Sequence, residues 1–484
     1  MVQVDFVNHL RPGVTGKDVI VTLCSLFNQD QVLNCAVEFT GSISKLGIDH
    51  RLTIANMTTE WGALAGLFPV DQVTVDWLEL QAKKLSALYP KGHPRLNRQA
   101  IDQLKKNIII ADADAAYAKK ITLDLATVGP YCSGPNSVKI AQPVAKLAAE
   151  KIAIQKAYLV SCTNSRASDL AEAANTIKGR KIAPGVEFYV AAASLQVQRE
   201  SETAGHWQTL IDAGAKVLPA GCGPCIGLGV GLLKEGEVGI SATNRNYKGR
   251  MGHKDAKAYL ASPAVVAESA VTGYISNPSG LGAAPVGTFT VSRDGASDST
   301  DAAQTSENAE KDSVDSIVGN AGDVINGNIL FCDMDNLNTD IIYPGKYTYQ
   351  DLNPSEMARV AMENYNKEFS SFAQKGDILV SGFNFGTGSS REQAATCLLY
   401  LGVKVVIVGS CSQTFKRNAI NNGLLVLEQP QLVSMLRAEA KGKSMQRMGE
   451  IKIDLERSKV AYRGRVFGIA SIGDLKSRLA IHSV

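Results

Sequence analysis

Apolar and polar positions follow helical or strand-like periods through most of the first 150 residues. Helical spacing of apolar residues predicts helices over 18–27, 58–68 and 73–88. The second of these would start with Thr58 or Thr59 as N-cap and end before Pro69. β-branched runs predict strands over residues 36–39 and 51–54. The mixture predicts a first α/β domain over residues 1–150.

Strand, loop and helix patterns repeat through residues 151–280, which we expect to form a second α/β domain. Strands are predicted over 156–161, 186–191, 216–219 and 238–241, and helices over 168–177 and 195–204. Cys162 directly follows the first of these strands, and Cys222 follows the third. Open α/β sheets bind ligands at the carboxyl ends of their strands, so both cysteine loops are expected at that edge.

The character of the chain changes over residues 281–325. Seven acidic residues lie between positions 292 and 315, among Ser, Thr, Ala and Asn and almost no large apolar residue. Such a segment buries too little surface to offset its ordering entropy, which favours an acidic flexible linker over an acidic binding segment.

Residues 326–484 are expected to form a last, detached β/α domain. Strands are predicted over 328–332, 377–380 and 403–408, with a helix over 391–401 between the second and third. The predicted fold class is therefore α/β throughout, with two α/β domains and a detached C-terminal β/α domain.

Composition narrows the class of protein. At 484 residues the chain exceeds one hydrophobic core, and its 45% hydrophobic and 20% charged residues are typical of globular domains. A net charge of +3 gives no basic excess for a nucleic-acid partner, and no apolar run approaches a membrane span. The nine cysteines are scattered, as in a reducing compartment, and the first residues show no targeting segment.

Three of these cysteines form the strongest chemical pattern. Cys222 and Cys225 are a C-x-x-C pair, and Cys162 lies in the sequence Ser161-Cys-Thr-Asn-Ser165. Structural zinc needs four ligands, and no fourth Cys or His stands at a suitable spacing. Three thiolates suit an iron–sulfur cluster with one open corner, although zinc or a redox dithiol is the alternative for the C-x-x-C pair alone.

Other candidate residues are weak by themselves. Gly386–Glu392 is a glycine-rich turn that opens a helix, as a carboxylate site or an ordinary helix start would. Arg245 and Arg250 suit carboxylate binding but could be surface charges. Glu60 could simply complement a helix dipole, and Lys346 could be a solvated lysine after a Pro-Gly turn.

Taken together, these motifs resemble the aconitase superfamily, and within it the fungal-type homoaconitases. The resemblance covers essentially the whole chain and rests on four motifs in order, Val160–Ser165, Gly221–Cys225, Thr243–Arg250 and Gly386–Glu392. It implies a hydro-lyase that interconverts homocitrate or homoisocitrate with cis-homoaconitate in lysine biosynthesis. It also implies a mitochondrial protein, a small tricarboxylate substrate and a monomeric state for the complete protein.

The resemblance also assigns roles to residues. Cys162, Cys222 and Cys225 would hold three irons of a [4Fe–4S] cluster, whose open iron polarises the departing hydroxyl. The implied catalytic residues are the base Ser390, its neighbour Arg391, and Glu60 near the open iron. Substrate contacts are implied for Arg245, Arg250, Lys346, Ser389 and Arg391, and contacts around the cluster for Asn56 and for Asn244 or Asn246.

The chain departs from the family pattern in one respect. None of the six histidines belongs to the Asp-His or the Asp-Ser-His motif of the family's first domain. They are His9, His50, His93, His206, His253 and His482. We therefore expect the chain to begin at the family's second domain and to lack part of the acid–base machinery. The alternatives are a 3-isopropylmalate dehydratase, which would differ mainly near residues 346–350, and an inactive cluster-binding chain.

Overall fold

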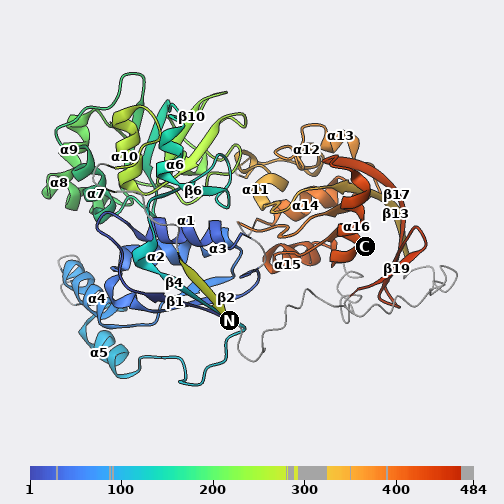
Figure 1. The fold of residues 1–484 in the computed structure, drawn as a ribbon, viewed down its shortest axis with the longest axis horizontal. Coiled ribbons are helices and arrows are strands. Elements are labelled where there is room, and N and C mark those ends of the chain that lie inside the picture. Colours follow the sequence, from blue (N-terminus) through green and yellow to red (C-terminus); the bar gives the residue numbers. More distant parts are fainter. Residues whose placement is uncertain are drawn as a thin grey trace. The chain divides into compact units, whose positions relative to one another are not determined.

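The computed structural model describes residues 1–28, 31–86, 89, 92–278, 281, 288–292, 324–348, 350–388 and 391–469 (Figure 1). The chain divides into two compact units. The N-terminal unit comprises residues 1–28, 35–246 and 251–296, and the C-terminal unit comprises residues 29–34, 247–250 and 297–484. Each unit is described separately below.

The first sheet of the N-terminal unit has the strand order β12-β4-β1-β2-β3. Its strands are β1 (Val2–Val7), β2 (Ala36–Gly41), β3 (Ala65–Leu67), β4 (Lys119–Asp124) and β12 (Phe289–Ser292). Strand β1 pairs in parallel with β2 and β4, and β12 is antiparallel to β4. Helix α1 (Gly16–Leu26) lies between this sheet and the second one, and most of its residues are buried (Figure 1).

Two predicted elements of this region are wrong. Residues 51–54 belong to helix α2 (Ile48–Asn56) instead of a strand, because a short apolar run does not distinguish the two by period alone. The next helix, α3 (Thr58–Trp61), stops at Gly62, whose φ of 109° suits glycine, and the chain then enters β3 instead of continuing to residue 68. The predicted helix at 18–27 and strand at 36–39 are confirmed as α1 and β2.

The second sheet of the N-terminal unit has the order β6-β5-β11-β10-β7-β8-β9. Its strands are β5 (Tyr131–Ser133), β6 (Ala141–Pro143), β7 (Lys156–Val160), β8 (Glu187–Ala191), β9 (Lys216–Val217), β10 (Val238–Ser241) and β11 (Lys257–Leu260). The five strands from β11 to β9 are parallel. Strand order reverses at β7, since β8 and β9 lie on one side of it and β10 and β11 on the other, which makes the β7–β10 edge the topological switch point.

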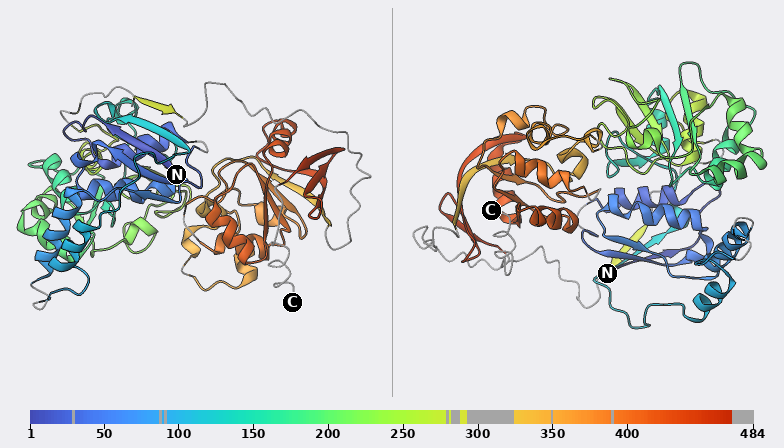
Figure 2. Two further views of the ribbon diagram at one scale, coloured as in Figure 1. Left: turned by 90° about the horizontal axis from the view of Figure 1, so that it is seen from below. Right: turned by 180° about the vertical axis from the view of Figure 1, so that it is seen from behind.

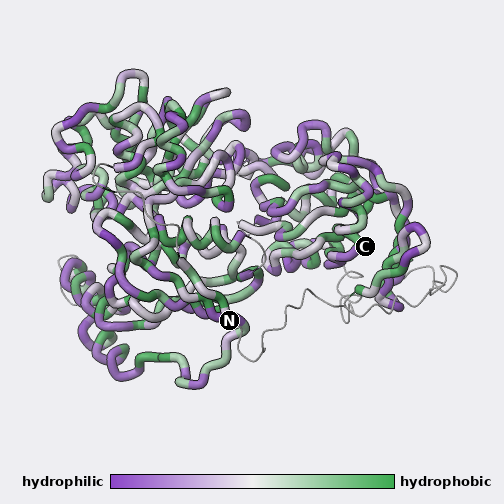
Figure 3. The backbone as a smooth tube through the Cα atoms, in the orientation of Figure 1, coloured by the Kyte–Doolittle hydropathy of each residue, from purple (hydrophilic) through white to green (hydrophobic). Residues whose placement is uncertain are grey.

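Further helices complete the described part of the N-terminal unit. They are α4 (Gln72–Leu85), α5 (Arg98–Lys106), α6 (Val144–Ala149), α7 (Ala167–Ile177), α8 (Leu195–Thr203), α9 (His206–Ala213) and α10 (Pro263–Thr272), with short 3-10 turns η1 (Ser42–Lys45), η2 (Leu125–Thr127) and η3 (Gly223–Ile226). Helices α7 and α10 pack together over β7. Hydrophobic residues recur along α1 and the strands, whereas α4 and α5 carry many hydrophilic ones (Figure 3).

The C-terminal unit is built on a sheet with the order β16-β15-β14-β13-β17-β18-β19. The strands are β13 (Val324–Cys332), β14 (Ile378–Ser381), β15 (Val405–Val408), β16 (Leu425–Glu428), β17 (Met445–Asp454), β18 (Lys459–Tyr462) and β19 (Arg465–Gly468). Its helices are α11 (Thr339–Ile342), α12 (Pro354–Arg359), α13 (Phe369–Phe372), α14 (Gln393–Tyr400), α15 (Gln413–Asn421) and α16 (Pro430–Ala440), with the 3-10 turn η5 (Gly345–Tyr347).

Alternate residues of β13 to β16 point to the two faces of this sheet. One face packs Leu330, Leu379 and Val406 against α14 and α15, and the other packs Phe331 and Ile407 against α16. Helices therefore cover both faces of the parallel strands, as the further views show (Figure 2). The described strands and helices of this unit fall within residues 324–468, and the predicted domain bounds of 326–484 stay a prediction.

The predicted division at residue 150 stays a prediction, although the strands already change from the first sheet to the second between Asp124 and Tyr131. Most of the predicted linker, 281–325, lies outside the described residues. Its residues 289–292 form edge strand β12 and residues 324–325 begin β13, while the linker as a whole stays a prediction. Among the described residues, no helix combines the length and apolar character of a membrane span.

Candidate active site

The Cys162 loop leaves the carboxyl end of β7, as predicted. Its turn is fixed by short side chains, since the Ser161 amide donates to Ser165 Oγ at 3.0 Å and the Thr163 amide donates to Ser161 Oγ at 3.0 Å. Cys162 itself is exposed. The loop therefore exposes the Cys162 thiol at the switch point of the sheet, on a backbone turn that these two hydrogen bonds fix.

A pocket of about 500 Å³ opens beside Cys162. Its wall includes Trp77 and Lys84 of α4 and Arg166 and Ser194 at the starts of α7 and α8. Arg166 also donates to the carbonyl of Cys162 at 3.2 Å and pairs with Asp49 at 3.2 Å. The exposed thiol is thus reached from solvent through an opening of the N-terminal unit whose wall contains both polar and apolar side chains.

Cys222 and Cys225 follow β9, at the same edge of the sheet. The Cys225 amide donates to the Cys222 carbonyl at 2.9 Å, and turn η3 places side chains three apart on one side. Cys222 is half-buried and Cys225 is buried. All three sulfurs are thiols rather than members of disulfides. The prediction that both cysteine loops lie at strand carboxyl ends is confirmed.

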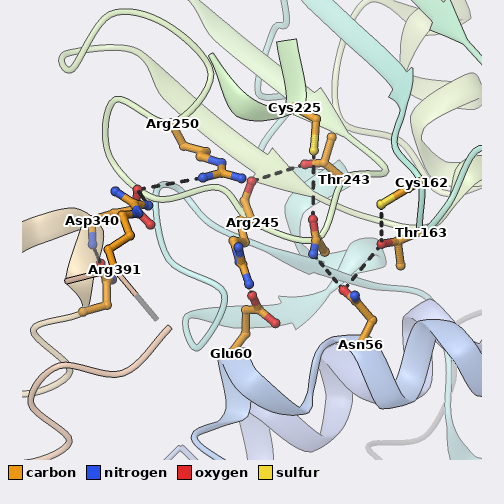
Figure 4. A network of polar contacts seen from close by, with 12 residues as sticks. Asn56, Glu60, Cys162, Thr163, Cys225, Thr243, Arg245, Arg250, Asp340 and Arg391 are labelled. Carbon is orange, nitrogen blue, oxygen red and sulfur yellow. Dashed lines mark hydrogen bonds and ion pairs between the residues drawn. The ribbon is translucent and has the colours of Figure 1, made fainter. Parts of the chain in front are cut away.

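A chain of polar contacts connects the two cysteine loops (Figure 4). The sulfur of Cys225 lies 4.0 Å from Asn244 Oδ1, and Asn244 Nδ2 donates to Asn56 Oδ1 at 2.7 Å. The same Asn56 oxygen accepts from Thr163 Oγ1 at 3.4 Å, and Thr163 Oγ1 lies 3.8 Å from the sulfur of Cys162. Asn56, the last residue of α2, is therefore the amide on which both loops converge.

The two asparagines around Arg245 have different surroundings. Asn244 takes part in the polar chain just described, whereas Asn246 is fully buried and donates to the backbone carbonyl of Ala258 at 3.0 Å. Of the two, Asn244 is therefore the residue near the cysteines. Asn246 holds together the strands from which the loop emerges.

Glu60 and Arg245 form an ion pair beside this network (Figure 4). Arg245 Nε donates to Glu60 Oε1, and the Glu60 side chain has no solvent-exposed area. Its other oxygen, Oε2, is buried without a hydrogen-bond partner among the described residues. A buried carboxylate oxygen without a partner is costly, so this atom is the point at which a substrate, water or proton would be received.

Lys17 is a residue of this region that the sequence analysis missed. It lies in the first turn of α1, is fully buried, and donates to the carbonyl of Thr243. Burial lowers the pKa of Lys17 to about 8, against the opposing effects of Glu60, Cys225, Asp169 and Asp18. The available signal is a lysine directly before the apolar helix predicted for residues 18–27, because lysine is rarely fully buried without partners.

Arg391 of the C-terminal unit also pairs with a buried carboxylate. Its guanidinium donates to Asp340 Oδ1 and, at 3.1 Å, to the Tyr343 carbonyl. Arg250 NH1 lies 4.0 Å from the same Asp340 oxygen (Figure 4). Asp340 thus joins two of the arginines implied to bind substrate, and it was not predicted. Ser389 and Ser390 lie outside the described residues, so their predicted roles stay predictions.

Lys346 lies in turn η5 of the C-terminal unit and has a specific partner. Its ammonium pairs with Glu363 at 3.0 Å and lies 4.5 Å from the ring centroid of Tyr347, whose hydroxyl donates to Glu363 at 2.8 Å. The Lys346 side chain is 42% exposed, so it is partly accessible to solvent although it is paired with Glu363. Its role in substrate contact stays a prediction.

Comparisons with known proteins give the family. Residues 1–273 match the aconitase family (aconitate hydratase), and residues 299–432 match the aconitase C-terminal domain. The chain is 56% identical over 446 residues to a protein named mitochondrial homoaconitase from Candida albicans, covering 91% of this chain and 65% of that one. It is 54% identical over 450 residues to a protein also named mitochondrial homoaconitase from Candida parapsilosis, covering 91% of this chain and 65% of that one.

A third relative, also named mitochondrial homoaconitase, comes from Mycosarcoma maydis and is 55% identical over 463 residues, covering 90% of this chain and 63% of its own. The chain thus spans about 65% of the length of the curated relatives it matches. The first family match alone extends over more than half of the sequence, and the fold is the α/β architecture predicted for it. The chain belongs to the aconitase family.

Proposed function

We propose that the chain works as a homoaconitase-type hydro-lyase, which adds and removes water between homocitrate or homoisocitrate and cis-homoaconitate in lysine biosynthesis. Three relatives at 54–56% identity carry that name, and their names also support a mitochondrial location for this chain. The observation that carries the proposal is the polar chain from Cys225 through Asn244 and Asn56 to Cys162.

The donor set fits a [4Fe–4S] cluster. Three thiols stand at one edge of one sheet, and the group around them is made of neutral amides and hydroxyls, which hydrogen-bond to sulfur without competing as metal ligands. Cys162, Cys222 and Cys225 would hold the cluster, and the open iron would supply Lewis acidity toward a substrate hydroxyl.

Arginines of the chain would orient the substrate. Arg245, Arg250 and Arg391 offer planar, always charged groups that match carboxylates in two-point contacts. Each is already held by a buried or part-buried carboxylate, Glu60 or Asp340, so its side chain is pre-oriented before substrate arrives. Lys346 and Ser389 would add contacts to the substrate's variable part.

Proton transfer would use two residues. Glu60 Oε2, buried and without a partner among the described residues, is placed to receive a proton or hold a water. Ser390 would remove the proton α to a carboxylate, as the resemblance implies. A hydroxyl is a weak base, so its alkoxide needs the amides of the glycine-rich turn and a nearby cation, for which Arg391 is the candidate.

Anaerobic reconstitution of the full chain tests this proposal. We expect iron and sulfide to bind in near-equal amounts, and Cys225→Ala to abolish that binding while Cys332→Ala, a buried cysteine of the C-terminal unit, leaves it intact. The loaded chain is then assayed with homoaconitate, isopropylmalate and aconitate. Preference for isopropylmalate would replace the substrate assignment, and a cluster without turnover of any of the three would mean a cluster-binding chain.

A further inference from the structure

We propose that Lys17 is a positioning residue that ties the Cys162 loop to the loop of Asn244 and Arg245, and that the cluster is retained only while this tie is intact. The inference rests on the proposed function, since it concerns the same three cysteines. It is carried by the contacts of a single buried ammonium group on α1.

The ammonium of Lys17 bridges two loops that leave neighbouring strands. It donates to the carbonyl of Thr243, lies 3.4 Å from the carbonyl of Ala242, and lies 3.5 Å from Asn164 Oδ1. Ala242 and Thr243 directly follow β10 and precede Asn244, while Asn164 is two residues beyond Cys162 after β7. One side chain therefore spans the topological switch point and sets the separation of the two loops.

Only a cation with several donors can make this arrangement. An ammonium has three N–H donors and no acceptor, which matches three oxygen acceptors from two directions. Asn164 is itself fixed on its other side, because its Nδ2 donates to Thr53 Oγ1 at 3.1 Å and to Asp169 at 3.3 Å. The tie therefore continues from α1 through the Cys162 loop to α2 and α7.

The charges that face Lys17 come from four elements. They are Asp18 of α1, Glu60 of α3, Asp169 of α7 and Cys225 of η3. All four are acidic groups, and burial lowers the pKa of Lys17 only to about 8, so the ammonium form is present at neutral pH. Lys17 thus adds a buried positive charge among these four acidic groups, in addition to Arg245, which pairs with Glu60.

Lys156 provides a matched control in β7, the strand that leads to the Cys162 loop. It is also buried, with 2% of its surface exposed, and its ammonium donates to the Leu232 carbonyl at 2.8 Å and pairs with Glu237 at 2.5 Å. It begins β7, whereas Cys162 follows the other end of that strand. Lys156 therefore matches Lys17 in residue type and burial, but it lies at the edge of the sheet opposite to the cysteine loops.

The test compares Lys17→Met and Lys156→Met in the full chain. After anaerobic reconstitution, we expect the Lys17 variant to lose visible absorbance and iron to a chelator about tenfold or more faster than wild type, as for lost support of a metal ligand. The Lys156 variant should lose absorbance and iron at the wild-type rate, even if its urea unfolding midpoint is lowered as much as that of the Lys17 variant. Equal loss rates in the two variants at equal stability would overturn the proposal.

An apo measurement separates this inference from the proposed function. If wild type takes up no cluster, the proposed function fails, and alkylation of the apo chain decides the role of Lys17. We expect Cys225, which is 4% exposed, to be alkylated faster in the Lys17 variant and at the wild-type rate in the Lys156 variant, by mass spectrometry of its peptide. Unchanged alkylation of Cys225 in the Lys17 variant would refute the tie itself.

Discussion

The two units each bury an arginine–carboxylate pair, but the two carboxylates are compensated differently. Glu60 pairs with Arg245 and leaves Oε2 buried without a partner among the described residues. Asp340 also leaves Oδ2 without one, yet it faces Arg391 and Arg250 together. Both carboxylates lie in the first turn of a four-residue helix, α3 or α11. The difference is therefore the number of guanidiniums that each carboxylate contacts, two at Asp340 and one at Glu60.

This difference separates an anchoring carboxylate from a reactive one. A carboxylate that contacts two guanidiniums holds both in place, so Asp340 is suited to keep Arg391 and Arg250 in position. Glu60 contacts one guanidinium and keeps a buried oxygen that can accept a hydrogen bond. The comparison predicts a stabilising role for Asp340 and a proton-transfer role for Glu60, and four experiments can break or sharpen it.

The largest effect is expected for Glu60→Gln, on turnover. The amide keeps the shape of the side chain and can still accept from Arg245, but it cannot take a proton. We expect the cluster-loaded enzyme to lose about 100-fold to 10,000-fold in kcat, the range for removing a general acid or base. Steady-state kinetics on homoaconitate measure this. Wild-type kcat with a raised KM would instead make Glu60 a binding residue.

Asp340→Ala should give the next largest effect, on stability. Removing one partner of a buried ion pair leaves the arginine charge uncompensated and costs about 3–5 kcal/mol. Urea unfolding of the C-terminal unit, followed by a probe within it, measures the loss. The exposed pair of Arg463 with Glu439 is the control, since Arg463→Ala should cost about 1 kcal/mol or less. Similar losses from the two variants would contradict an anchoring role for Asp340.

A smaller effect is expected from the titration of Lys17. Its folded pKa of about 8 lies below the unfolded value of 10.5, so between these pH values the unfolded chain binds more protons. Lys17 therefore adds a rise in stability as pH increases from about 8 to 10.5, because the cost of burying its charge disappears. Urea midpoints across this range should show that rise in wild type relative to Lys17→Met. Parallel curves for the two proteins would contradict the lowered pKa.

Local sequence patterns predicted where the cysteines stand, but not what surrounds them. The β-branched runs before Cys162 and Cys222 and the helix after Cys162 appear as β7, β9 and α7. These elements depend on neighbouring residues, which a periodic pattern captures. The loops' placement at one edge then follows from the rule for open sheets.

Contacts between distant segments could not be read in this way. Glu60 and Arg245 are 185 positions apart, and Lys17 is 226 positions from Thr243, so no local period relates them. Residues 51–54 failed for a related reason, since buried Arg51 is held by Asp71 and by the Ile43 carbonyl, and these tertiary contacts override a weak local preference. The resemblance named Glu60 and Arg245, included Asp340 in a Thr-Asp-x-Ile-x-Pro signature without giving it a role, and did not mention Lys17.

The smallest effect is expected for the second cation at Asp340. Arg250 NH1 lies 4.0 Å from Asp340 Oδ1, beyond hydrogen-bond distance, and its side chain is 11% exposed. We expect Arg250→Gln to destabilise the C-terminal unit by about 1 kcal/mol, against about 3 kcal/mol or more for Arg391→Gln. A double-mutant cycle with Asp340→Asn isolates each arginine's coupling to that carboxylate. Coupling of Arg250 as strong as that of Arg391 would show that two arginines hold Asp340. Zero coupling would leave Asp340 with one arginine partner, the same number as Glu60, and would remove the contrast between the two carboxylates.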